Sequence, residues 1–134
     1  MGDAAVTRLY KDGIGSAFIT AEAAARTAVL RGISRQDFAV GYRPVCLRIA
    51  ADNSYGRLFF RLWSLTFYAP VLRKAWTQAI IDEANHLVDN HIHTRVLWGM
   101  FTGEESYRLL FWMSLSVPAL LNLFLAALRT KGTR

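Results

Sequence analysis

The sequence predicts an all-α protein, and three observations lead to this fold class. Strand signals, meaning alternating apolar and polar residues bounded by turn residues, are nearly absent from the 134 residues. Aromatic and leucine side chains instead recur at helical spacing, and only three prolines interrupt the chain. We therefore expect several short to medium helices, followed by a C-terminal apolar helix or broken hairpin. The latter is expected to be embedded in a membrane or buried by a partner.

The N-terminal part of the chain predicts a loop followed by a helix. Residues 1–15 are rich in glycine and charge, which is typical of a loop. A helix is expected over residues 16–30, because Ser16 can cap its start, alanine dominates its middle and Gly32 follows its end. Ser34 is a second candidate cap and opens a helix that continues to about residue 53.

Prolines and glycines divide the middle of the chain. Pro44 should kink the helix over 34–53 or divide it. Gly56 is expected to separate a third helical segment, residues 57–68. Pro70 closes that segment and begins a fourth helix, because proline is tolerated in a first turn.

The helix that starts at Pro70 is expected to run to about residue 90. Residues 91–103 give a weaker helix signal, since Gly99 and Gly103 lower helix propensity there. The chain thus divides into a glycine-rich loop (1–15), a helical region (16–103) and an apolar segment with a basic tail (104–134).

Residues 109–128 form the most distinctive stretch, because they contain no charged side chain. Twenty helical residues cover ~30 Å, which is the thickness of the hydrocarbon core of a bilayer. Pro118 and Asn122 interrupt the apolar pattern, and basic residues follow it at 129, 131 and 134. Three arrangements stay open: a broken helix or hairpin in the membrane interface, a true span, and a helix buried by protein.

Composition and charge favour contact with a membrane. Hydrophobic residues make up 53% of the chain and charged residues 19%, which excludes intrinsic disorder and is unusual for a soluble enzyme domain. The net charge is +6, and residues 53–81 lack acidic side chains while arginines alternate with tryptophan and phenylalanine. This mixture is typical of an interfacial membrane segment rather than of a nucleic-acid surface. We expect membrane lipid and a protein partner, no nucleic acid, and a location on the cytoplasmic side, since no secretory signal is present.

The opening of the chain carries the one motif that suggests a cofactor. Gly2 and Asp3 begin a Gly-Asp-Ala-Ala stretch, and Gly13, Ile14, Gly15 and Ser16 form a glycine-rich turn at the head of the first helix. A carboxylate can bind hydroxyl groups, and a helix start offers free N–H groups to an electron-rich ligand.

This arrangement resembles the second flavin-contacting motif of FAD-dependent oxidoreductases of the geranylgeranyl reductase and p-hydroxybenzoate-hydroxylase-like family. Three further stretches look like the helical C-terminal region of bacterial members, namely residues 42–46, 52–57 and 96–108. The resemblance implies that Asp3 contacts the ribityl–pyrophosphate part of FAD. It also implies that the turn at residues 13–16 faces the isoalloxazine ring.

The chain lacks the Gly-x-Gly-x-x-Gly fingerprint with which that family binds the ADP half of FAD. We therefore expect the C-terminal helical portion of a flavoprotein, active as an oxidoreductase only together with a Rossmann-type partner or a missing N-terminal part. The alternative is a non-catalytic accessory subunit of a respiratory or photosynthetic membrane complex. No nucleophilic triad or P-loop is present, so no catalytic residue is predicted.

Three histidines, His86, His91 and His93, lie close together in the sequence, and Glu83 precedes His86 by three residues. The simplest interpretation is that these residues form the solvent-exposed polar end of a helix. A metal site and an axial ligand to a haem or pigment are the alternatives, but the second Glu/His pair of a di-iron bundle is missing. The single cysteine excludes an internal disulfide. The sequence therefore predicts no metal ligands.

Overall fold

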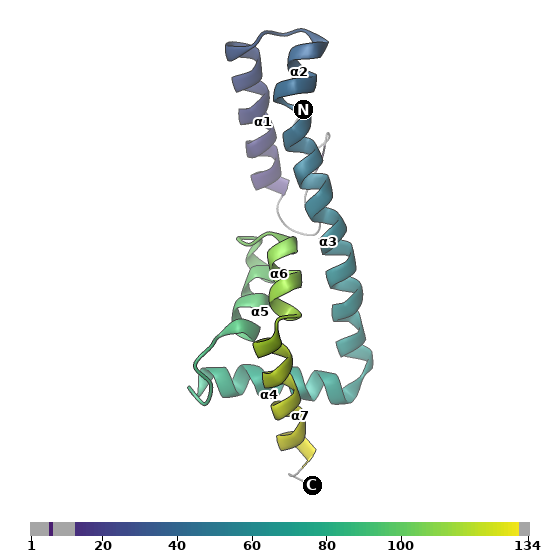
Figure 1. The fold of residues 1–134 in the computed structure, drawn as a ribbon, viewed down its shortest axis with the longest axis vertical. Coiled ribbons are helices and arrows are strands. Elements are labelled where there is room, and N and C mark those ends of the chain that lie inside the picture. Colours follow the sequence, from purple (N-terminus) through teal and green to yellow (C-terminus); the bar gives the residue numbers. More distant parts are fainter. Residues whose placement is uncertain (1–5, 7–12, 132–134) are drawn as a thin grey trace. The chain divides into compact units, whose positions relative to one another are not determined.

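The computed structural model describes residue 6 and residues 13–131, and every regular element in this part of the chain is a helix. The described helices are α1 (Gly13–Leu30), α2 (Arg35–Gly41), α3 (Arg43–Tyr68), α4 (Pro70–Ala84), α5 (Ile92–Thr102), α6 (Tyr107–Ser114) and α7 (Val117–Lys131) (Figure 1). The all-α prediction is thus confirmed for the described residues. The chain forms two compact units, Met1–Tyr55 and Gly56–Arg134, and α3 contributes to both.

The first unit pairs α1 with α2 through a tight turn. Gly32 makes this turn with φ of 128°, a left-handed value that glycine adopts without strain. Ser34 then caps α2 as predicted: its backbone N–H donates to Asp37 Oδ2 over 3.0 Å, and the Asp37 N–H donates to Ser34 Oγ over 3.2 Å. These reciprocal bonds form a capping box. Pro44 lies in the first turn of α3, so it divides the predicted helix instead of kinking it.

Small and hydroxyl side chains, rather than large apolar ones, fill the buried face of α1. The buried residues of this helix are Ser16, Thr20, Ala24 and Thr27. The two threonine hydroxyls donate to carbonyls one turn earlier, on Ser16 and Ala23, over 2.8 and 2.7 Å. Because these side chains are short, α1 and α2 approach closely at Thr27 and Gly41. Phe18 and Val29 remain exposed.

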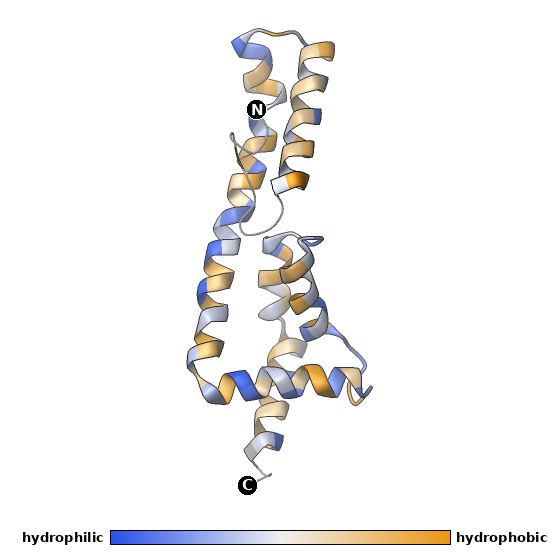
Figure 2. Ribbon diagram, turned by 180° about the vertical axis from the view of Figure 1, so that it is seen from behind, coloured by the Kyte–Doolittle hydropathy of each residue, from blue (hydrophilic) through white to orange (hydrophobic). Residues whose placement is uncertain are grey.

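The second unit is built around α4. This helix packs most extensively on α7, while α5 and α6 lie side by side (Figure 1). Alanines supply the buried apolar residues of the α4–α7 pair, namely Ala75, Ala79, Ala119 and Ala126. Figure 2 shows hydrophobic residues spread over all the helices rather than concentrated in one of them.

Several predicted boundaries differ from the structure. α1 begins at Gly13, three residues before the predicted start, so Ser16 lies inside the helix and does not cap it. Gly56 does not separate two segments, because α3 continues through it to Tyr68. One glycine lowers helix propensity by only about 1 kcal/mol, which the rest of a 26-residue helix outweighs. α4 begins at Pro70 as predicted but ends at Ala84, six residues early.

The apolar C-terminal stretch is a broken helix. α6 and α7 meet at an angle of 53°, with the break at Leu115 and Ser116. Serine hydroxyls at the break bond to the backbone: Ser114 Oγ donates to Leu110 O and Ser116 Oγ to Met113 O, both over 2.8 Å. Within residues 13–131 no individual helix has the length and apolar character of a membrane span, and only the bent α6–α7 pair reaches them jointly.

Replacing Gly41 with alanine should destabilise the first unit. A Cβ atom at this position would lie 2.9 Å from Thr27 Cγ2, closer than real Cβ contacts allow. We expect a loss of ~1–3 kcal/mol from this overlap, larger than the ~1 kcal/mol that alanine gains in helix propensity. Urea unfolding followed by circular dichroism at helical wavelengths measures the change. In a Thr27→Ala background the same substitution should become neutral or stabilising, and an equal cost in both backgrounds would contradict the overlap.

Candidate functional site

The structure describes four of the six residues predicted to contact flavin. Gly13, Ile14, Gly15 and Ser16 form the first turn of α1. Ile14 is 90% exposed, whereas Ser16 is buried and its carbonyl accepts the Thr20 hydroxyl. Gly2 and Asp3 lie outside the described residues. The predicted glycine-rich turn is therefore helical, and the apolar side chain of Ile14 in it is exposed.

A buried carboxylate at the end of α4 forms the most completely bonded polar cluster of the second unit. Glu83 is 0% exposed and accepts four hydrogen bonds from the start of α5. The backbone N–H groups of His93 and Thr94 each donate over 2.8 Å. The Thr94 hydroxyl donates over 2.8 Å, and His93 Nδ1 lies 2.7 Å from Glu83 Oε1. Glu83 thus acts as a cap supplied by another helix.

Electrostatics explains why this carboxylate tolerates burial. Burial alone raises the pKa of Glu83, but the hydrogen bonds from Thr94 and His93 together outweigh it and hold the pKa below its ordinary value of 4.5. Glu83 is therefore ionised at neutral pH, and His93 donates through Nδ1–H. The charge also lies at the N-terminus of α5, where the helix dipole favours an anion.

Asp82, the residue before Glu83, connects α4 to a different helix. Asp82 is 4% exposed, Arg129 Nη1 on α7 donates to its Oδ2 over 2.7 Å, and Gln78 Nε2 donates to its Oδ1 over 2.8 Å. Nearer the start of α7, Asn122 Nδ2 donates to Asn90 Oδ1 over 3.0 Å. Two adjacent acids therefore hold α4 to both α5 and α7.

The structure separates the three histidines that the sequence groups together. His93 is buried, with its ring 4.7 Å from that of Trp76. The interpretation as a solvated helix end is therefore wrong for Glu83 and His93, because α5 folds back over α4. His86 and His91 are exposed, with ring centroids 5.8 Å apart. Within the described residues no three acidic, histidine or cysteine side chains come together as metal ligands.

The sequence did not predict the capping role of Glu83, because the helix start that it caps, at His93 and Thr94, lies about ten residues later in the chain. α5 begins at Ile92, and the side chain of its N-cap residue, His91, makes no capping hydrogen bond. A helix that lacks Ser, Thr, Asp or Asn at this position leaves its first N–H groups to be satisfied from elsewhere. The lack of a capping residue before α5 was therefore the signal in the sequence that a cap comes from elsewhere, but it does not identify Glu83 as that cap.

An apolar pocket of about 130 Å³ lies in the second unit beside the α6–α7 break. Its walls are Phe59, Leu62, Trp63, Thr66, Trp76, Phe111, Ser114, Leu115, Leu120 and Leu123. The two hydroxyls in this wall, Thr66 and Ser114, donate to carbonyls of their own helices over 2.6 and 2.8 Å. None of these lining residues has an acidic or basic side chain.

Comparison of the chain with family models, with curated proteins and with solved structures finds no match.

Glu83→Gln should destabilise the second unit strongly. The glutamine amide nitrogen would replace one accepting oxygen and leave buried donors of His93 or Thr94 unpaired. We expect a loss of ~3 kcal/mol in the free energy of unfolding at neutral pH. Urea unfolding followed by tryptophan fluorescence is suitable, because the Trp76 ring contacts His93. Asp89→Asn, at an exposed position, is the matched control and should change stability by less than ~0.5 kcal/mol.

The same variant also predicts a pH dependence. Because folding lowers the pKa of Glu83, the carboxylate contributes stability above its unfolded pKa, near 4.5, and loses that contribution as pH falls through the lower folded value. The difference in stability between the native chain and Glu83→Gln should therefore be constant near neutral pH and shrink below about 4.5. A difference that grows on acidification would contradict an ionised Glu83.

Proposed function

We propose that this chain is the helical portion of an FAD-dependent oxidoreductase similar to geranylgeranyl reductases. In this proposal the portion associates with the cytoplasmic side of a membrane. The observation that carries the proposal is the position of Gly13–Ser16 at the first turn of the 18-residue helix α1, ten residues after the Gly2-Asp3 pair. A nucleotide-binding fold on another polypeptide or another part of the protein would complete the pocket.

The start of α1 suits contact with a flat, electron-rich ring. The helix dipole places partial positive charge at the N-terminus of a helix, which favours electron-rich atoms of a ligand there. Two glycines in this turn, Gly13 and Gly15, leave room for a ring near the backbone, and the Ile14 side chain is open on its surface. These residues fit one wall of a flavin site, and a bound flavin would supply hydride transfer to or from an apolar substrate.

The exposed face of α1 supports a protein partner at this end of the chain. Ile14, Phe18 and Val29 lie on one side of the helix and are 90%, 69% and 82% exposed. Their spacing of four and eleven residues places them on one helical stripe. Large apolar side chains in such a stripe are normally covered, which fits a nucleotide-binding fold packed against α1.

Flavin retention tests this proposal. The purified chain alone should hold no FAD, because it lacks a pyrophosphate cradle. Co-expression with a Rossmann-type protein encoded beside it should yield a complex with flavin absorbance, and Gly15→Val should lower its flavin content ~tenfold by blocking the approach to the helix start. Asp3→Ala should do the same. Ala51→Val, at an exposed position of α3 in the same unit and outside the α1 stripe, is the control.

Stoichiometric FAD on the isolated chain would contradict the incomplete pocket. Colourless complexes with every such partner would contradict the shared flavin site.

The second candidate is a non-catalytic accessory subunit of a membrane complex, and the packing of α7 favours it. Ala119 and Ala126 are buried, whereas a stripe of large apolar residues faces outward: Val117, Leu121, Phe124 and Leu128. Small residues inside and large apolar residues outside are typical of helices that pack within lipid. Under this candidate, Asp3→Ala would change no cofactor content.

The outward stripe of α7 should govern membrane association. Each fully buried Leu or Phe side chain contributes about 1.5–3 kcal/mol, so Leu121→Glu/Phe124→Glu should lower binding to lipid vesicles at least ~tenfold. Flotation with phosphatidylglycerol vesicles measures the bound fraction. Ala84→Glu/Thr102→Glu adds the same charge at exposed positions of α4 and α5 and should retain more binding. Equal losses in both variants would show that net charge, not the α7 stripe, determines association.

A further inference from the structure

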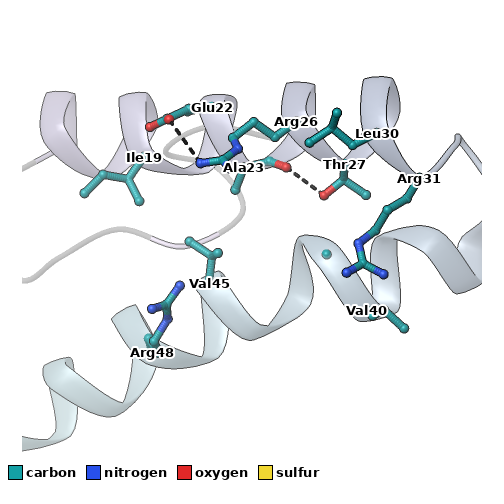
Figure 3. Close-up of a pocket in the computed structure, with 11 residues that line it drawn as sticks. Ile19, Glu22, Ala23, Arg26, Thr27, Leu30, Arg31, Val40, Val45 and Arg48 are labelled. Atoms are coloured by element: carbon teal, nitrogen blue, oxygen red, sulfur yellow. Dashed lines mark hydrogen bonds and ion pairs between the residues drawn. The ribbon is translucent and has the colours of Figure 1, made fainter.

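A basic groove of about 430 Å³ lies in the first unit, between α1 on one side and α2 with the start of α3 on the other (Figure 3). This volume is within the range of ordinary ligand sites. No residue of this groove belongs to the predicted flavin-contacting turn. We define the basic groove by the residues used below: Ile19, Arg26, Leu30, Arg31, Val45 and Arg48.

The basic groove is elongated along α1. Its lining from this helix begins at Ile19, recurs every three or four residues and ends at Leu30, and Arg31 follows directly after the helix. Twelve helical residues span ~18 Å, or more than three turns. An occupant that contacts the whole groove must therefore be extended, as a helix or peptide is.

Positive charge dominates the rim of the basic groove. Three guanidinium groups, on Arg26, Arg31 and Arg48, line it together with a single carboxylate, Glu22. Glu22 Oε1 lies 3.9 Å from Arg26 Nη1 in an exposed pair, which is weak. Arg48 has no carboxylate partner within the described part of the chain. The groove therefore attracts an acidic occupant.

Apolar side chains form the rest of the basic groove. Ile19 from α1 and Val45 from α3 point toward one another across the gap (Figure 3). Ile19 is 44% exposed and Leu30 is 73% exposed, so both have apolar surface left to bury. An occupant must therefore combine an apolar stripe with flanking acids.

We propose that the basic groove binds an acidic amphipathic helix of a protein partner. Apolar side chains at every third or fourth position of that helix would pack between Ile19 and Val45, and its flanking carboxylates would meet Arg26, Arg31 and Arg48. An amphipathic helix lying in a groove between two helices is a recurrent mode of recognition. The convex face of a helix enters such a recess, whereas the surface of a bilayer contacts only its rim. Charge complementarity makes the binding selective for acidic helices.

Three designed peptides test the proposal with the full chain. The acidic probe is a labelled helix of about 14 residues with leucines at every third or fourth position and glutamates beside them. The basic probe replaces each glutamate by lysine, and a scrambled acidic probe keeps the composition but loses the stripe. We expect fluorescence anisotropy to show the acidic probe binding at least ~tenfold more tightly than either of the others.

Charge reversal separates the groove from general attraction. Arg31→Glu/Arg48→Glu should weaken the acidic probe at least ~tenfold and raise affinity for the basic probe. The matched control is Arg35→Glu/Arg43→Glu, two exposed arginines of the same unit outside the groove lining, which should keep the preference of the native chain. Circular dichroism confirms that both variants keep their helices.

Three results would overturn the proposal. The first is equal binding of the acidic and scrambled probes, and the second is an equal loss in the two charge-reversed variants. The third is binding of phosphatidylglycerol vesicles that depends on Arg31 and Arg48 without binding of the acidic probe, which would assign the basic groove to lipid. Flavin content does not enter any of these measurements, so the outcome is independent of the flavin pocket.

Discussion

The second unit depends on one buried ion, Glu83, which has no lysine or arginine partner among the residues that the structure describes. Glu83 lies at the end of α4, and its charge is stabilised by donors at the start of α5. Because those donors include the first free N–H groups of a helix, one carboxylate both holds α5 in place and supplies its missing cap. Asp82 likewise holds α7 in place, because it accepts a hydrogen bond from Arg129. The arrangement of helices around α4 follows from these two neighbouring acids.

Both units show the same departure from ordinary globular packing. α1 buries serine, threonine and alanine while Phe18 is exposed, and α7 buries alanine while Phe124 is exposed. In a self-contained soluble domain the large apolar residues are the ones that fill the core. α1 and α7 therefore pack on their neighbours through short side chains and leave large apolar side chains exposed, which supports the proposal that lipid or another protein covers them. This pattern is the physical link between the fold and both proposed functions.

Local signals in the sequence predicted two helix starts correctly, whereas Ser16 was predicted to cap a helix and lies inside α1. Ser34 was predicted to cap a helix and does so, and Pro70 was predicted in a first turn and begins α4. Gly56 was predicted to separate two helical segments, but the loss of helix propensity at one glycine is small compared with the stability of a long helix. Glu83 and His93 could not be placed, because their burial depends on a contact between helices that no local pattern encodes. The flavin-contacting role of Gly13–Ser16 stays a prediction, and Gly2 and Asp3 are outside the described residues.

The bend between α6 and α7 has a consequence for solvation. A break in a helix normally leaves carbonyl and N–H groups that need water, which opposes transfer into oil. Here Ser114 and Ser116 direct their hydroxyls to Leu110 and Met113 carbonyls, and the Ala119 N–H donates back to Ser116 Oγ over 3.4 Å. The hydroxyl groups of Ser114 and Ser116 act at these two carbonyls as bound water molecules would. These bonds satisfy part of the hydrogen-bonding capacity of the kink and so lower its dehydration penalty in an apolar medium.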